Sequence, residues 1–139
     1  MFQAGRLAQV IVRFDTLPGR VVFWQGINSG SGWVTENNKW MADQSWEIGG
    51  PHGCAEHMAD KRGRFDHVRL IENTDARAVV HWRTASPDIT YAQNHVEPDT
   101  GWGEWTDEYY TIYPDAVAVR YQEVRSTWAA NMEWQQTEL

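Results

Sequence analysis

The sequence predicts an all-β fold in which antiparallel hairpins form a β-sandwich or one large twisted sheet. Three observations support this fold class. Several segments alternate apolar and polar residues, turn residues separate these segments, and no helix-length pattern lies between them. Sequences in which strand follows strand in this way form antiparallel sheets. At 139 residues the chain has the size of one domain, so we expect a single β domain over 1–139, or a piece of a longer protein.

The first half of the chain contains two clear strand signals and one weaker one. Leu7–Phe14 alternates well, and after the turn signal at Pro18 a largely apolar strand is expected over Arg20–Ile27. Trp33–Met41 is strand-like but is interrupted by two asparagines. Glycine and proline then break up residues 49–63, and the periodicity disappears, so we expect a long loop there.

The second half is expected to contain two hairpins. One covers 65–84 and turns around residues 73–75, and the other covers 105–125 and turns at Pro114-Asp115. Residues 86–104 are expected to be irregular. The segment 127–139 is ambiguous between a final strand and a short helix, because it shows no helix cap or stop signal.

The register of the first hairpin decides which polar side chains share a face. A three-residue loop would pair Glu72 with Ala76, so that the even-numbered residues form an apolar set and the odd-numbered residues a polar set. This register places His67 opposite His81. The arginines Arg69 and Arg83 would flank them and offer planar guanidinium groups to an anion. The alternative is a solvated surface whose charges contribute little.

The second hairpin is expected to place Tyr110 opposite Arg120, with Glu108 on the same face. A neighbouring arginine stabilises a phenolate, which is one route to a general base. The alternative is a cross-strand pair of an aromatic ring and a cation with a purely structural role.

Composition and charge limit the functions that need to be considered. The net charge of −7 argues against nucleic-acid binding, and no apolar run is long enough to cross a membrane. The N-terminal residues lack the pattern of a signal peptide. The chain contains nine tryptophans, more than a domain of this size can easily bury. Exposed indole rings could stack on sugar rings or on a neighbouring chain, and the ligand-binding candidates are Trp33, Trp40 and Trp102.

No cofactor is expected. A weak metal-site candidate consists of His52, Cys54 and His57, since thiolate and imidazole are good zinc ligands. Their spacing matches no standard zinc signature closely. The favoured interpretation is therefore a loop with a buried free thiol and solvent-facing histidines, and no metal. Cys54 is the only cysteine, which excludes an internal disulfide bond.

Several phrases of the sequence resemble a group of large secreted bacterial proteins associated with polysaccharide degradation. The phrases are RVVFWQGI at 20–27, WVTENNKW at 33–40, HVRLIENTDARAVVHWR at 67–83, GWGEWTDEYYTIYPDAVAVR at 101–120 and EWQQTEL at 133–139. The resemblance implies a β-sandwich carbohydrate-active protein in the context of ulvan lyases, and an extracellular or periplasmic location. Those relatives are much longer than this chain, and a glycine would be expected where Ala116 stands.

The resemblance and the polar faces together suggest a domain that binds an anionic polysaccharide or oligosaccharide, or cleaves it by β-elimination as a polysaccharide lyase. A lyase needs a cation to neutralise a uronate carboxylate and a group that removes the neighbouring proton. By analogy the candidate catalytic residues are His67, His81, Tyr110 and Arg120, with Arg69 and Arg83 as ligand-binding residues. The alternative function is a structural or assembly domain that forms homo-oligomers or packs on a larger protein, without catalysis.

Overall fold

The computed structural model describes residues 10–24, 30–42, 46–50, 52–126 and 132–134, and within these ranges the chain folds into three antiparallel sheets. The N-terminal sheet has the order β1-β2-β3-β4, from Val10–Arg13, Arg20–Phe23, Ser31–Val34 and Trp40–Ala42. The long sheet has the order β10-β9-β8-β7, from Ala118–Arg125, Trp105–Ile112, Ala78–Thr84 and Asp66–Asn73. The small sheet has the order β11-β5-β6, from Met132–Trp134, Trp46–Gly50 and Gly53–Glu56. The predicted all-β antiparallel fold class is confirmed.

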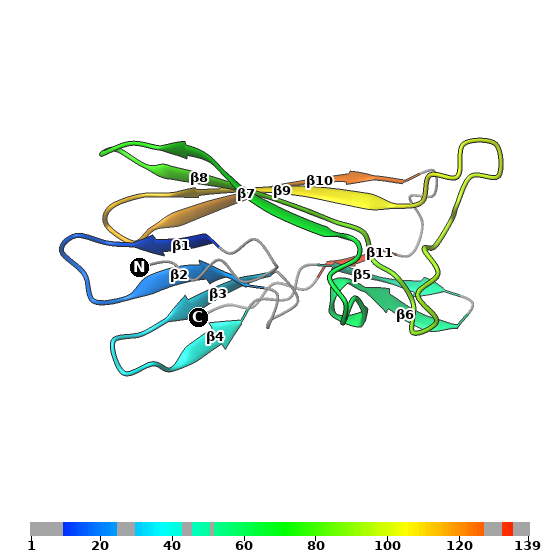
Figure 1. The fold of residues 1–139 in the computed structure, drawn as a ribbon, viewed down its shortest axis with the longest axis horizontal. Coiled ribbons are helices and arrows are strands. Elements are labelled where there is room, and N and C mark those ends of the chain that lie inside the picture. Colours follow the sequence, from blue (N-terminus) through cyan, green and yellow to red (C-terminus); the bar gives the residue numbers. More distant parts are fainter. Residues whose placement is uncertain (1–9, 25–29, 43–45, 51, 127–131, 135–139) are drawn as a thin grey trace.

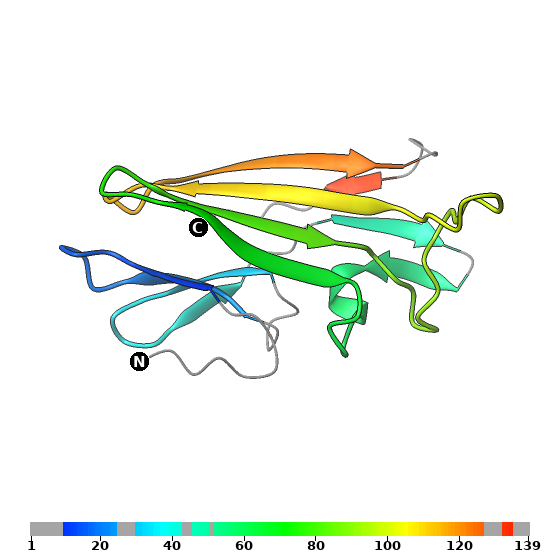
Figure 2. The same cartoon turned by 45° about the horizontal axis from the view of Figure 1, so that its top comes forward.

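The sheets form a sandwich of two layers. The long sheet makes one layer by itself, and the N-terminal sheet and the small sheet lie beneath its two ends (Figures 1 and 2). One face of the long sheet therefore looks into the molecule, and the other faces outward. We call these the inner face and the outer face.

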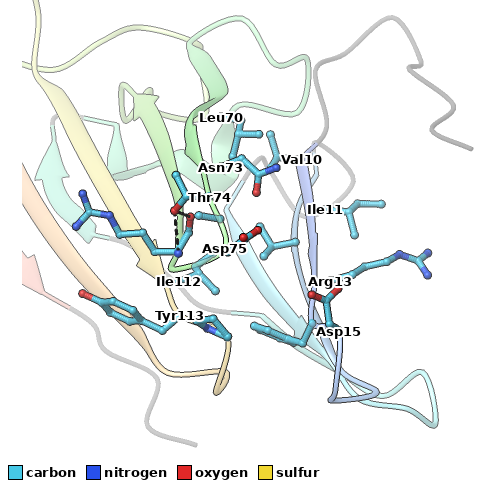
Figure 3. A pocket seen from close by; sticks show the side chains of 15 residues that line it. Val10, Ile11, Arg13, Asp15, Leu70, Asn73, Thr74, Asp75, Ile112 and Tyr113 are labelled. Atoms are coloured by element: carbon cyan, nitrogen blue, oxygen red, sulfur yellow. Dashed lines mark hydrogen bonds between the residues drawn. The ribbon is translucent and has the colours of Figure 1, made fainter.

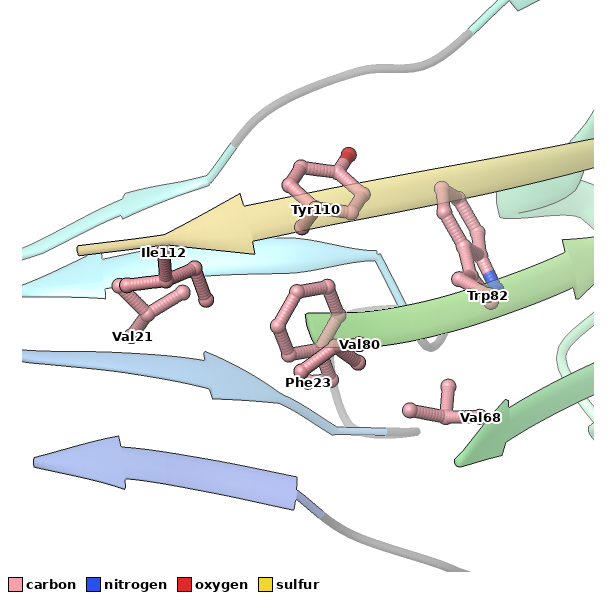
Figure 4. Packing of buried hydrophobic residues seen from close by; sticks show 7 residues of the cluster. All are labelled: Val21, Phe23, Val68, Val80, Trp82, Tyr110 and Ile112. Atoms are coloured by element: carbon pink, nitrogen blue, oxygen red, sulfur yellow. The ribbon is translucent and has the colours of Figure 1, made fainter. Parts of the chain in front are cut away.

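The core lies between the N-terminal sheet and the inner face of the long sheet (Figure 4). Phe23 of β2 meets Tyr110 of β9 edge to face, with ring centroids 4.9 Å apart. Trp82 of β8 is 1% exposed and contributes the largest buried side chain of the core. The full cluster comprises Val21, Phe23, Val68, Val80, Trp82, Tyr110 and Ile112.

The β9–β10 hairpin has the predicted register, with Tyr110 opposite Arg120 and Ile112 opposite Ala118. The turn closes through a hydrogen bond of 2.9 Å from the Tyr113 amide to the Val117 carbonyl. Ala116 occupies this turn with φ at 66°, in the left-handed region where a side chain costs about 1–2 kcal/mol relative to glycine. A glycine at this position, as the resemblance leads one to expect, would fit that backbone without strain.

The β7–β8 hairpin keeps the predicted division of faces but has a different register. Arg69, not His67, lies opposite His81, and His67 pairs with Arg83. The predicted pairing of His67 with His81 is therefore wrong. The turn is longer than expected, since Asn73 pairs with Ala78, and a bulge between Leu70 and Glu72 shifts the strand again. The two changes together keep Val68, Val80 and Trp82 on the core side, whereas Ala76, which was expected to pair with Glu72, lies in the turn and is exposed.

The predicted long loop at 49–63 is also wrong, because β5, β6 and the short 3-10 helix η2 (His57–Ala59) occupy most of it. β5 pairs with β6 on one side and with β11 on the other. Non-local pairing thus makes strands from a glycine-rich stretch that has low strand propensity. The pairing also identifies part of the ambiguous C-terminal segment as a strand. The ends of the predicted strands at 7–9 and 25–27 lie outside the described residues.

Candidate functional site

The paired strands of the long sheet place neighbouring residues of β9 on opposite faces. Trp82 pairs with Glu108, and His81 pairs with Tyr109. Even-numbered residues of β8 and β9 consequently point into the core, and odd-numbered residues point outward. Two like pairs, Asp107-Glu108 and Tyr109-Tyr110, are split in this way between the faces. The predicted polar sets around His81 and around Tyr110 therefore lie on opposite sides of one sheet and do not form one cleft.

The inner face carries a buried polar cluster centred on Glu108, which is fully enclosed at 0% exposure. Arg120 Nε lies 3.0 Å from Glu108 Oε2, and Gln122 Nε2 donates to Glu108 Oε1 at 2.5 Å. The Tyr110 hydroxyl donates to Glu108 Oε2 at 2.8 Å and accepts from Ser31 Oγ at 3.2 Å. These contacts satisfy the buried carboxylate and join the N-terminal sheet to the long sheet.

The direction of the pKa shift argues against Tyr110 as a base, and the Arg120 guanidinium carbon lies 5.8 Å from the centroid of the Tyr110 ring, as in the alternative aromatic–cation pair. Burial is the main cause that raises the pKa of Tyr110 well above its ordinary value, and the negative charge of Glu108 raises it further. Arg120 acts in the opposite direction but has the smaller effect. The phenol stays protonated and serves as a hydrogen-bond donor to Glu108.

The outer face carries a network centred on Asp107 and His81. Both side chains are largely buried, and His81 Nε2 lies 2.7 Å from Asp107 Oδ1. Arg69 Nε donates to His81 Nδ1 at 3.1 Å, so both ring nitrogens of His81 are engaged. The imidazole stacks on the Tyr109 ring, with centroids 4.7 Å apart and planes inclined by 20°. Arg83 Nη1 and Arg125 Nε each lie 3.5 Å from Asp107 Oδ2.

This network borders a pocket of about 490 Å³, which we call the tryptophan–arginine pocket. Arg83 stacks over the ring of Trp105, with its guanidinium carbon 5.0 Å from the ring centroid. Trp102 meets Trp105 edge to face at 6.3 Å and is 60% exposed, so it presents an open indole. The lining residues are Arg83, Glu97, Trp102, Gly103, Trp105, Arg125 and Ser126. Two aromatic rings beside two guanidinium groups suit a ligand that has both a flat apolar face and an acidic group.

The structure brings only some of the predicted site residues to this pocket. Arg83 and Trp102 line it. His81 does not line it but contacts Asp107, and Arg69 in turn contacts His81. His67 is exposed on the outer face of β7. The other two predicted tryptophans belong to the N-terminal sheet: Trp33 packs against the core and stacks with Phe14, and Trp40 is 44% exposed beside Trp24.

The three weak metal candidates have separate environments. His52 Nδ1 lies 2.7 Å from Asp88 Oδ2, while His57 is buried edge to face against Trp82 at 5.0 Å. Cys54 is exposed. Within the described ranges, the group whose donor atoms lie within 4.8 Å of one another is Glu47, Cys54 and Glu56, and neither histidine belongs to it.

Asp88 organises the irregular segment after β8. Its carboxylate accepts hydrogen bonds from the Thr90 hydroxyl at 2.6 Å and from the Ala92 amide at 3.0 Å. These donors, with the Thr90 hydroxyl first and the His52 ring next, hold the pKa of Asp88 below its ordinary range. The carboxylate of Asp88 thus holds the first part of the segment that was predicted to be irregular.

A second cavity of about 560 Å³ lies at the opposite end of the sandwich, between β1 and the turns of the two long-sheet hairpins (Figure 3). Val10, Leu70 and Ile112 give it an apolar floor, and Asn73 and Asp75 lie at its edge. Thr74 closes the neighbouring turn by accepting from the Arg77 amide at 3.2 Å. None of the residues predicted to bind or to catalyse lines this cavity.

Sequence reasoning missed four residues of the outer face and pocket: Trp105, Asp107, Tyr109 and Arg125. The parity of the second hairpin already assigns all four to one face. The pairing of β9 with β8 was the missing information. That register alone shows that these four residues lie on the same face as His81 and Arg83.

The comparisons give no relative to guide the assignment: no family model, no curated protein and no solved structure matches the chain. Among the described residues, no helix is long and apolar enough to cross a membrane.

Proposed function

We propose that this chain is a carbohydrate-binding domain that recognises an acidic polysaccharide or oligosaccharide in the tryptophan–arginine pocket. The observation that carries the proposal is the convergence of Trp102, Arg83 and Arg125 on one open pocket. Trp102 offers a face on which a pyranose ring can stack, and guanidinium groups recognise carboxylates by paired hydrogen bonds. The resemblance to secreted carbohydrate-active proteins agrees with this assignment and favours an extracellular or periplasmic location.

We assign binding, not elimination, to the pocket. A general base needs a nitrogen or oxygen that can take a proton from the substrate. His81 does not line the pocket, and Tyr110 lies on the other face of the sheet with a raised pKa. The remaining candidate, His67, is exposed at the edge strand.

The test is a calorimetric titration with oligogalacturonate, beside the neutral, reduced form of the same oligosaccharide. We expect the acidic ligand to bind, and Trp102→Ala and Arg83→Gln each to weaken binding by about tenfold or more, as central aromatic and arginine contacts do. Trp24→Ala serves as the matched control, because it removes a partly exposed indole that directly follows β2 and does not line the pocket. Absence of binding by the wild type, or equal losses in the control, would refute the assignment. Absorbance of unsaturated uronate ends in the same samples would reveal cleavage.

A second candidate function, self-association, is favoured by the edge strand β10. Among the strands that the structure describes, β10 is an edge strand of the long sheet, and it presents Val119 and Tyr121 at 55% and 60% exposure. Exposed edge strands readily pair with other strands. If the domain assembles, static light scattering will give a mass that rises with concentration, and Val119→Lys will keep the chain monomeric. A constant mass of 16.1 kDa would exclude this function.

A further inference from the structure

Asp107 connects His81 to the two arginines of the tryptophan–arginine pocket. Its carboxylate is 3% exposed and is shared by His81 on Oδ1 and by Arg83 and Arg125 on Oδ2. Both arginines line the pocket. The charge that Asp107 directs toward them therefore depends on the charge of His81.

The hydrogen bonds define the proton positions on His81. An arginine cannot be deprotonated in a protein, so Arg69 Nε must donate, and His81 Nδ1 must accept with its lone pair. The ring proton consequently sits on Nε2 and is donated to Asp107. In this arrangement the imidazole is neutral, and Asp107 keeps a full negative charge for the two pocket arginines.

Every element packed around His81 contributes a charged or titratable group. Arg69 faces it from β7, and Arg83 lies two residues along its own strand. β9 supplies Asp107 and Tyr109. On β10, Tyr121 contacts Tyr109 at 6.2 Å, and Glu123 pairs with Arg125 at 3.1 Å. Asp107 is the only one of these groups that combines contact with His81 and contact with the pocket arginines.

Resting on the proposed function, we propose that protonation of His81 strengthens binding of an acidic saccharide in the tryptophan–arginine pocket. The ring takes one proton from solvent at Nδ1, which can then no longer accept from Arg69. The resulting imidazolium draws the charge of Asp107 toward Oδ1, so Arg83 and Arg125 lose part of their counter-charge. Arg69 is exposed on an edge strand and can turn toward solvent or ligand.

The expected effect is moderate. Sugar carboxylates stay ionised down to about pH 4. The ligand charge therefore does not change between pH 8 and about pH 5.5. One added charge near a solvent-exposed site should tighten binding about fourfold over this range at low salt, and less at high salt.

The experiment measures the dissociation constant of oligogalacturonate at pH 8 and at about pH 5.5 for three proteins. Wild type should bind about fourfold more tightly at the lower pH. His81→Gln should bind equally at both, because its amide can donate to Asp107 and accept from Arg69 without titrating. His67→Gln, which removes an exposed histidine paired with Arg83, should keep the pH dependence. Circular dichroism at both pH values confirms that each protein is folded.

The possible outcomes separate the inference from the proposed function. If no protein binds at either pH, the binding function itself fails, and the inference fails with it. If wild type binds but His81→Gln keeps the pH dependence, or His67→Gln loses it, only the inference is overturned. If His81→Gln does not fold, NMR of the wild-type imidazole replaces it. Saturating ligand should then move the His81 titration midpoint upward by the same fourfold factor, and an unchanged midpoint overturns the proposal.

Discussion

Replacing Arg120 with methionine is expected to lower the free energy of unfolding by about 3–5 kcal/mol, the cost of leaving a buried charge without its partner. Arg120 lies 3.0 Å from Glu108, whose side chain is completely buried. Methionine fills a similar volume but supplies no positive charge. Tyr110 and Gln122 still donate to the carboxylate in the variant, yet neither neutralises it. Chemical denaturation monitored by tryptophan fluorescence measures the loss.

The double variant Glu108→Gln with Arg120→Met distinguishes a lost charge from lost packing. When both charges are removed, the buried position holds only a neutral amide, and we expect most of the stability to return. Glu123→Gln is a surface control with a small expected effect, because the Arg125–Glu123 pair is exposed. A loss below about 1 kcal/mol for Arg120→Met, or no recovery in the double variant, would contradict the proposed role of the ion pair.

The domain is expected to lose about 3 kcal/mol of stability between pH 6.5 and pH 4 through His57 alone. Burial is the main cause that lowers the pKa of His57 from 6.5 to about 4, and the positive charges of Arg120 and Lys61 add to it. Above pH 6.5 the imidazole is neutral in both folded and unfolded chains, and this contribution to stability is fully present. As the pH falls toward 4, the unfolded chain binds a proton that the folded chain excludes, so stability decreases.

The measurement is the free energy of unfolding against pH for wild type and for His57→Phe, which keeps an aromatic ring beside Trp82. The phenylalanine variant cannot titrate at this position, so its profile should be flatter by about 3 kcal/mol over the same range. His67→Gln is the control, since this histidine is exposed. Parallel profiles for wild type and His57→Phe would disprove the assignment.

The fold class and the faces of both long hairpins could be predicted, because alternation of apolar and polar residues is a local signal. The β9–β10 register also followed from the sequence, since a short turn leaves few alternatives. The β7–β8 register did not, because the extra turn residue and the bulge at Ile71 depend on the Thr74–Arg77 contacts and on packing. β5 and β6 exist through pairing with distant strands, which composition cannot reveal.

The types of residue in the candidate site could be predicted from the sequence, but not which residues come together there. Arginines on an outer face and an exposed tryptophan could be expected from parity and composition. The separation of His81 from Tyr110 could not be derived from single hairpins, because it depends on how β8 pairs with β9. The same pairing brings Asp107 between His81 and the two arginines, and Asp107 had no distinguishing signal in the sequence.

The doublets Asp107-Glu108 and Tyr109-Tyr110 have a consequence for how the chain reaches its native pairing. If β9 slipped by one residue, an aspartate would replace the buried glutamate, and one tyrosine would replace the other. The central residues of β9 therefore do little to favour the native register over this shifted one. The difference between the two pairings is larger near the end of the strand, where Thr111 would replace Ile112, which is 1% exposed. Ile112 and the adjoining turn thus favour the native register of the hairpin over this misaligned one.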